Sequence, residues 1–245
     1  MYISAAAKRL YLKISGSQTD LKPVFVLAHG LGTDHRYALL QGLKAKLQRH
    51  GTVVQFDFAG YGHSSTGLRF RKVSSYVADL STVISWLRSQ QAYKERQIVV
   101  IGHSLGGLAT LLKLGQANNG IDAAVLIAVN AQPQRLYQDY LQRGLLKQLK
   151  KESHIGRQRV AVDFWKDRKS VLPLKFARRI RKPVLLIYGT EDHINPPAEG
   201  RLLYGVIPNR HKKLALIKTD HHFDTTSARN QLYKLLIKWF QTYVS

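Results

Sequence analysis

Residues 98–107 read IVVIGHSLGG, an apolar run that passes directly into a glycine-rich turn around Ser104. The run predicts a strand buried on both faces, and the apolar residues Leu108–Leu114 that follow predict a helix. Gly102–Gly106 therefore fits the pattern G-x-S-x-G at a strand-to-helix turn. A serine at such a turn takes a strained backbone conformation, and its hydroxyl lies above the sheet near a helix N-terminus, where developing negative charge is stabilised. The competing interpretation is that Ser104 only caps the helix.

Similar apolar or β-branched runs recur along the whole chain and predict further strands. Between several of them, leucines and other apolar residues repeat at helical spacing. Strands that alternate with helices predict an α/β fold with a doubly wound, mostly parallel sheet. The predicted strands cover residues 9–15, 23–29, 52–58, 97–102, 123–129, 183–189 and 212–218, and the clearest predicted helices cover 37–49, 73–88 and 232–243.

Composition excludes several classes of protein. The chain has 245 residues, 44% of them hydrophobic and 22% charged, which is ordinary globular usage and excludes disordered, collagen-like and coiled-coil chains. The absence of cysteine excludes disulfides, thiol catalysis and thiolate metal sites. No run of 18 apolar residues and no secretory signal pattern is present, so we expect no membrane span and a cytoplasmic location. We expect a single domain over residues 1–245.

The basic charge is concentrated in one part of the chain. The formal net charge is +23, from 38 basic and 15 acidic residues, and residues 133–182 alone carry 15 basic and four acidic ones. We predict that residues 133–182, called the cap below, are a short helical insertion between two strands. Such an excess attracts nucleic acid or anionic lipid, although no helix-turn-helix, zinc-finger or RNA-binding motif is present. The simpler alternative is a solvated surface.

A serine nucleophile needs a base and an orienting acid, which in this kind of fold follow it in the order Asp or Glu, then His. Asp192 follows the predicted strand 183–189, with Glu191 as its neighbour and competitor, and either carboxylate could instead cap a helix near Pro197. His221 and His222 follow the last predicted strand.

Five loops of the sequence resemble those of the α/β-hydrolase superfamily of serine hydrolases, in register over nearly the whole chain. Within it the chain is most similar to small bacterial cinnamoyl or feruloyl esterases. The similar loops are AHGLG (28–32), DFAGYGHS (57–64), GHSLGG (102–107), GTED (189–192) and DHHF (220–223).

The resemblance implies a role for each matching position. Ser104 is the nucleophile, Asp192 orients the base, and the backbone N–H groups of Leu31 and Leu105 form the oxyanion hole. Matching DHHF to the family pattern D-H-x-F selects His221 as the base, whereas counting without a gap from the preceding strand selects His222. We predict His221, and His222 is the alternative. The family uses the position of Asp57 to hold a loop, so we expect a structural role for that carboxylate.

These roles predict a serine esterase that cleaves carboxylic esters through an acyl-serine. Thioesterase, lipase and amidase chemistry use the same triad and stay open. Two alternatives from other classes are a catalytically silent binding module and a basic nucleic-acid-binding protein. No cofactor or metal is expected, because the histidines show no H-E-x-x-H spacing.

In the related fold the cap lies over the nucleophile, which suggests what it selects. We hypothesise that an apolar acyl group packs beneath it while a basic side chain meets an anionic part of the substrate. The alternative is that these charges only face solvent. The basic candidates are Arg135, Arg143, Lys147, Lys150, Lys151, Arg157 and Arg159, and the apolar ones are Leu136, Tyr137, Tyr140, Leu145, Leu146, Phe164 and Trp165.

Overall fold

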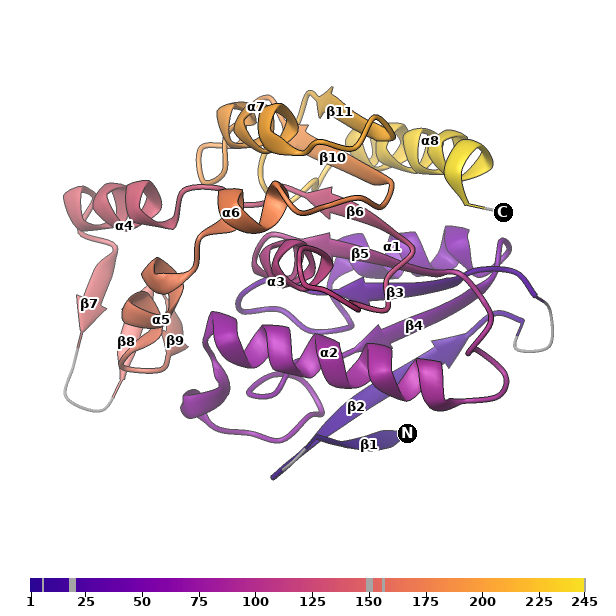
Figure 1. Ribbon diagram of the computed structural model, residues 1–245. Helices are drawn as coiled ribbons and strands as arrows, with labels where there is room; N and C mark the ends of the chain where they lie inside the picture. The colour runs from indigo at the N-terminus through magenta and orange to yellow at the C-terminus, as the bar shows by residue number, and fades with distance from the viewer. Residues whose placement is uncertain (6, 18–20, 149–151, 156, 245) are drawn as a thin grey trace.

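An eight-stranded sheet forms the centre of the protein, which is described here by a computed structural model (Figure 1). The structure describes residues 1–5, 7–17, 21–148, 152–155 and 157–244. The strand order is β1-β2-β4-β3-β5-β6-β10-β11, in which β1 and β2 pair antiparallel with their neighbours and all other pairs are parallel. The strands are β1 (Tyr2–Ala5), β2 (Lys8–Ser15), β3 (Val24–Ala28), β4 (Thr52–Phe56), β5 (Ile98–His103), β6 (Ala123–Ile127), β10 (Val184–Gly189) and β11 (Lys212–Ile217).

Helices cover both faces of this sheet, so the fold is that of an α/β-hydrolase. One face packs against α2, α3 and α7, and the other packs against α1 and α8. The helices are α1 (Ala38–Leu47), α2 (Val73–Ser89), α3 (Leu105–Leu114), α7 (Pro197–Val206) and α8 (Thr226–Tyr243), with a short 3₁₀ turn at Leu68–Phe70.

The sequence of β3 shows why the central strands are apolar throughout. Successive side chains of a strand point to opposite faces. Val24 and Val26 therefore pack on the side of α2 and α3, whereas Phe25 and Leu27 pack on the side of α1 and α8, and all four are buried. A strand covered on both faces has no solvent side, so it keeps no polar alternation.

The cap lies between β6 and β10, where the sequence predicts it, but it is only partly helical. In Figure 1 its helices and small strands gather at one end of the sheet. Besides helices it contains an antiparallel three-stranded sheet that the sequence analysis does not predict, because three-residue strands are too short to show a period. The cap elements are α4 (Pro133–Gln142), β7 (Leu146–Gln148), β8 (Ser153–Ile155), β9 (Gln158–Val160), α5 (Phe164–Ser170) and α6 (Pro173–Ala177).

The seven strands predicted from sequence are all present, and β1 is an eighth. Within the described residues, no helix is long and apolar enough to cross a membrane.

Candidate active site

Ser104 lies at the turn between β5 and α3, in a backbone conformation that non-glycine residues rarely adopt. Its φ is +53° and its ψ is −116°. The turn is fixed from both sides, because the Ser104 N–H donates to the carbonyl of Ile127 at 2.9 Å and its own carbonyl accepts from Leu108 N–H at 2.9 Å. Strain of this kind persists only where the surrounding structure holds it. This conformation places the Ser104 hydroxyl at the start of α3, as the pattern G-x-S-x-G predicts.

His221 lies between Ser104 and Asp192 and bonds to both. Its Nδ1 is 2.7 Å from Asp192 Oδ2, and its Nε2 is 3.0 Å from Ser104 Oγ. Since a carboxylate can only accept, Nδ1 carries the ring hydrogen of the neutral imidazole, and Nε2 is left to accept the hydroxyl hydrogen of Ser104. Asp192 is 2% exposed and His221 is 7% exposed, so both groups interact away from bulk water.

The loop after β10 holds the second oxygen of Asp192. Its Oδ1 accepts from the backbone N–H groups of Ile194 and Asn195, both at 2.8 Å. The Asn195 side chain in turn donates to the carbonyl of Ala128 at 2.8 Å, which ties this loop to the end of β6. The two hydrogen bonds to Oδ1 therefore fix the carboxylate so that Oδ2 faces His221.

The loop that carries His221 is held by its neighbours. His103, at the end of β5, donates from Nε2 to the carbonyl of His221 at 2.9 Å. Burial, with the nearby His221 ring as a smaller cause, lowers the pKa of His103 to about 3, so its ring is neutral near pH 7. Asp220 accepts from the N–H of His222 and of Phe223, which fixes the turn beyond His221.

The competing residues from the sequence analysis lie elsewhere. His222 is exposed, and its Nδ1 lies 3.3 Å from the hydroxyl of Tyr37 rather than at Ser104. Glu191 is exposed as well, and no described residue bonds to its side chain. The hydrogen bonds to Ser104 and between histidine and carboxylate are thus made by His221 and Asp192, and not by His222 or Glu191.

Leu31 and Leu105 both lie beside Ser104. Leu105 is the first residue of α3, and Leu31 follows β3 in a loop that lines the same cavity as Ser104. Neither backbone N–H donates to any described residue.

Comparison with known families agrees with this geometry. Residues 19–172 match the family Hydrolase_4, described as serine aminopeptidase, S33. The chain belongs to this hydrolase family.

Individual relatives of this Hydrolase_4 chain are distant. It is 27% identical over 184 residues to the uncharacterized protein YfhR of Escherichia coli O157:H7, a match that covers 75% of this chain and 57% of YfhR. The chain thus spans little more than half of that relative. It is 24% identical to an uncharacterized 31.7 kDa protein of Escherichia coli, over 82% of this chain and 84% of that protein. Among solved structures, Est1E from Butyrivibrio proteoclasticus with bound ferulic acid superposes with a TM-score of 0.87 at 17% identity, covering 99% of this chain and 98% of Est1E.

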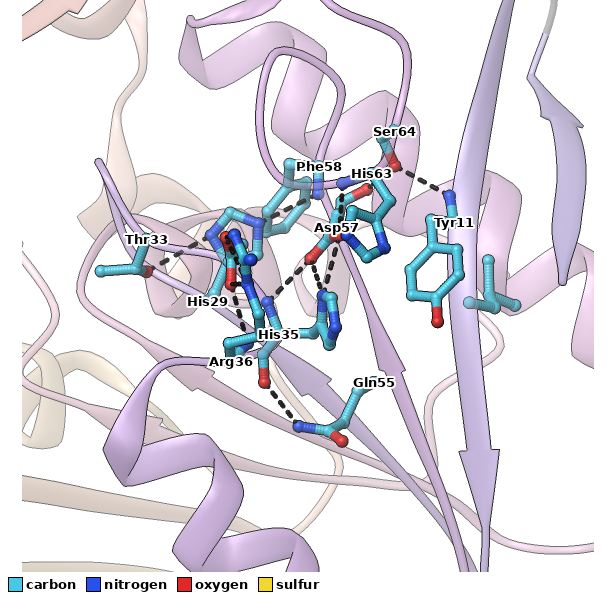
Figure 2. Close-up of polar contacts among 12 residues, drawn as sticks. Tyr11, His29, Thr33, His35, Arg36, Gln55, Asp57, Phe58, His63 and Ser64 are labelled. Carbon is cyan, nitrogen blue, oxygen red and sulfur yellow. Dashed lines mark hydrogen bonds and ion pairs between the residues drawn. The ribbon is translucent and has the colours of Figure 1, made fainter.

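The Hydrolase_4 chain holds its serine-side loops together through Asp57. Figure 2 shows this buried carboxylate between the loops that follow β3 and β4. It accepts from the backbone N–H of His35 at 2.7 Å and of His63 at 2.8 Å, and from the His35 ring at 2.8 Å. Gly62 is required here, because its φ is +50° and a Cβ would lie 2.1 Å from Asp57 Oδ2. Asp57 thus ties two loops together and makes no hydrogen bond to Ser104 or His221.

His29 also connects the loops that follow β3 and β4. Its Nδ1 donates to the carbonyl of Gly30 at 2.8 Å, and its Nε2 accepts from Phe58 N–H at 3.0 Å (Figure 2). Burial lowers the pKa of His29 to about 4, so the ring stays neutral and can keep both roles.

One group of side chains has metal-ligand composition. Ligand atoms of His35, Asp57 and His63 all lie within 4.8 Å of one another. Both Asp57 oxygens already accept N–H groups, and His35 Nδ1 is bonded to that carboxylate. The group is therefore satisfied internally as a tie between loops.

A cavity of about 220 Å³ opens at Ser104 and His221, with the cap on its other side. Of the apolar cap residues predicted to line it, Leu136 and Tyr140 do so. The others lie outside the lining, and Tyr137, Phe164 and Trp165 instead pack with one another behind it.

Of the basic cap residues proposed from sequence, those that the structure describes do not line this cavity. Arg135 pairs with Glu199, Arg143 with Asp139 and Arg159 with Glu152, while Lys147 and Arg157 are exposed. Lys150 and Lys151 lie outside the described residues. The basic residue that lines the cavity is Arg168 of α5, which the sequence analysis did not single out, since nothing local separates it from fourteen other cap cations.

Proposed function

We propose that this protein is a serine esterase that cleaves small carboxylic esters through an acyl-serine at Ser104. The observation that carries the proposal is the position of His221, which is bonded at once to Ser104 Oγ and Asp192 Oδ2. A nucleophile bonded to a base, with the base oriented by a third group, is the arrangement that covalent catalysis by serine requires.

In the first half-reaction, Ser104 Oγ attacks the ester carbonyl carbon while its proton passes to His221 Nε2. The imidazolium that forms is stabilised by Asp192, which keeps its negative charge. When the tetrahedral intermediate collapses, the bond to the alcohol oxygen breaks and His221 returns the proton to that oxygen. The acyl group stays on Ser104 as an ester.

In the second half-reaction, water takes the place of the alcohol. His221 Nε2 accepts a proton from the water as its oxygen attacks the acyl carbon, and the proton then goes to Ser104 Oγ as the acyl bond breaks. The carboxylic acid leaves and the free serine is restored.

Charge on the carbonyl oxygen develops next to the start of α3. We assign its stabilisation to the backbone N–H groups of Leu31 and Leu105, for which the described residues supply no acceptor. Each such donor contributes about 3 kcal/mol to transition-state stabilisation in serine hydrolases.

The size of the cavity favours small substrates. At about 30 Å³ per water molecule, a cavity of about 220 Å³ holds roughly seven atoms of that size. This space fits a short acyl group.

The test is labelling with a fluorophosphonate probe, combined with hydrolysis of p-nitrophenyl butyrate and of the matching p-nitroanilide. We expect the wild type to be labelled at Ser104 and to cleave the ester much faster than the anilide. Ser104→Ala should lose both labelling and turnover, because the covalent step has no other nucleophile. A wild type that is not labelled would favour a silent binding module, and faster cleavage of the anilide would favour an amidase.

The choice of base is tested by two neighbouring variants. His221→Ala should lose nearly all ester hydrolysis, whereas His222→Ala, which removes an exposed ring, should retain it. Full activity of His221→Ala together with loss in His222→Ala would reverse the assignment.

A further inference from the structure

Arg168 is a buried cation in the wall of the candidate active site, and among the described residues it has no hydrogen-bond or ion-pair partner. It lies on α5 and is 6% exposed, whereas the other described basic residues of the cap are exposed or half-buried. It lines the same cavity as Ser104 and His221. An arginine so placed needs an explanation, because burying an unpaired charge is costly.

The guanidinium makes no hydrogen bond and no ion pair with any residue that the structure describes, and its Nε is fully buried without an acceptor. Arginine carries five N–H donors in a planar fork that matches a carboxylate. None of these donors is used within the described protein.

Neighbouring groups hold the Arg168 side chain in place without neutralising it. The guanidinium carbon lies 5.4 Å from the ring centre of Trp165 and 5.8 Å from that of Phe164, a distance at which aromatic faces attract cations. The carboxylate that acts electrostatically on Arg168 is Glu199, whose oxygens accept from Arg135 and from the backbone N–H groups of Ala131 and Gln132.

Arg168 stays charged near neutral pH. Burial lowers the pKa of its guanidinium to about 10, which is still well above 7. The cavity therefore contains a full positive charge together with a nucleophile.

We propose that Arg168 is a specificity-determining residue that binds a carboxylate on the substrate, so that the preferred esters are half-esters of short dicarboxylic acids. This inference rests on the proposed esterase function. The cavity of about 220 Å³ agrees with it, since the acyl part of a five-carbon half-ester has eight non-hydrogen atoms. The guanidinium supplies the specificity, because a carboxylate offers its N–H donors a charged acceptor that a neutral ester lacks.

The experiment compares two ethyl esters of the same shape. Monoethyl glutarate carries the carboxylate, and ethyl 5-methylhexanoate carries an isopropyl group in its place. We expect the wild type to show the higher kcat/KM on monoethyl glutarate. Arg168→Met, which keeps length and apolar contact, should lower that value about 10- to 100-fold and leave the neutral ester within about 3-fold. Arg168→Lys should restore part of the loss, because it returns the charge without the fork.

An exposed cation serves as the matched control. Arg143→Met removes an equal charge from the outer end of α4, where the side chain is exposed and pairs with Asp139. We expect it to leave the ratio of the two esters unchanged. Salt provides a second control, since a contact buried in the cavity is screened far less than one made by exposed residues. The preference for the half-ester should therefore persist at high salt.

Binding without turnover separates this proposal from the esterase proposal. Glutarate should raise the melting temperature of Ser104→Ala and have no such effect on the double variant with Arg168→Met. If the wild type cleaves neither ester and is not labelled at Ser104, the esterase function fails. If it cleaves the neutral ester but Arg168→Met lowers both esters equally, or the wild type prefers the neutral one, then Arg168 has only a packing role and this inference is overturned.

Discussion

Asp192→Asn tests the orienting acid most directly, because asparagine keeps the shape of the side chain and removes only its charge. In the wild type one oxygen accepts two backbone N–H groups and the other accepts His221 Nδ1–H. An asparagine can satisfy only one of these sides with its single oxygen. If the oxygen faces the backbone, the amide N–H₂ faces His221, whose Nδ1 must then be the acceptor. Its Nε2 then carries the hydrogen and cannot accept the proton of Ser104.

The same contacts give the free-energy cost of the catalytically productive orientation, in which the amide oxygen of the Asp192→Asn variant faces His221. Turning the amide oxygen toward His221 leaves the N–H groups of Ile194 and Asn195 facing an N–H₂ group. Each unsatisfied buried donor costs about 1–3 kcal/mol, which makes about 2–6 kcal/mol for both. At about 1.4 kcal/mol per factor of ten, kcat should fall between roughly 30-fold and 10⁴-fold. The upper end is the loss that this substitution causes in serine proteases.

The assay is steady-state hydrolysis of p-nitrophenyl butyrate, with urea unfolding as the check on folding. We expect kcat to fall and KM to change little, because the lost interaction acts in the chemical step. Glu191→Gln is the matched control, since it removes the same charge from the adjacent, exposed position. The reasoning is refuted if folded Asp192→Asn keeps activity within about 3-fold of wild type, or if Glu191→Gln loses as much.

Three further predictions concern the scaffold. Burial lowers the pKa of His29 to about 4 and that of His103 to about 3, against about 6.5 in the unfolded chain. Below pH 6.5 the unfolded state therefore binds more protons than the folded state. The free energy of unfolding should then fall by up to about 1.4 kcal/mol per pH unit for each ring, until the folded pKa of that ring is reached. Urea unfolding from pH 7 to 4.5 measures this fall, and an NMR titration that gives either ring a pKa near 6.5 in the folded protein contradicts it. Gly106→Ala would place a Cβ 2.3 Å from the backbone oxygen of His29, so we expect urea unfolding to show at least about 3 kcal/mol of destabilisation. The control is Gly205→Ala in the last turn of α7, where a Cβ meets nothing within 4 Å and the substitution should be neutral or stabilising. Equal effects of the two substitutions would show that the close approach at Gly106 is unimportant. Glu199→Ala removes the acceptor for the backbone N–H groups of Ala131 and Gln132, just before the cap. It should cost about 2–6 kcal/mol and speed proteolysis within the cap, and an unchanged digestion pattern would contradict this.

The fold was predictable because its central strands are buried on both faces. A run such as Val24–Ala28 can stay apolar over its whole length only where both sides are covered, and this property is visible in the sequence alone. The sequence does not predict the strand β1, because the four residues Tyr2–Ala5 are too few to establish a period. The cap sheet was missed for the same physical reason, since strands of three residues are defined by their partners and carry no period of their own.

The candidate site was predictable where it follows strands. Ser104, Asp192 and His221 each come shortly after a parallel strand, and the carboxyl ends of such strands meet at one edge of the sheet. The family pattern D-H-x-F already favoured His221, but the neighbouring His222 stayed an alternative, because a shift of one residue in a loop changes which ring points inward. Arg168 could not be found at all from sequence, because burial of a single cation depends on how α5 packs against the rest of the cap.

The carboxylate binding proposed for Arg168 differs physically from the general attraction of a very basic protein for anions. An exposed cation acts through water and salt, which screen its field within about 10 Å, so the net charge of +23 attracts anions without distinguishing their shapes. Arg168 lies in a small, partly enclosed cavity where each interaction is stronger and where its donors have fixed directions. The same burial makes the empty site energetically unfavourable, and the rings of Phe164 and Trp165 offset only part of that cost. A substrate carboxylate would relieve it, whereas a neutral ester would leave the charge unpaired, and this difference is the physical basis of selectivity at the site.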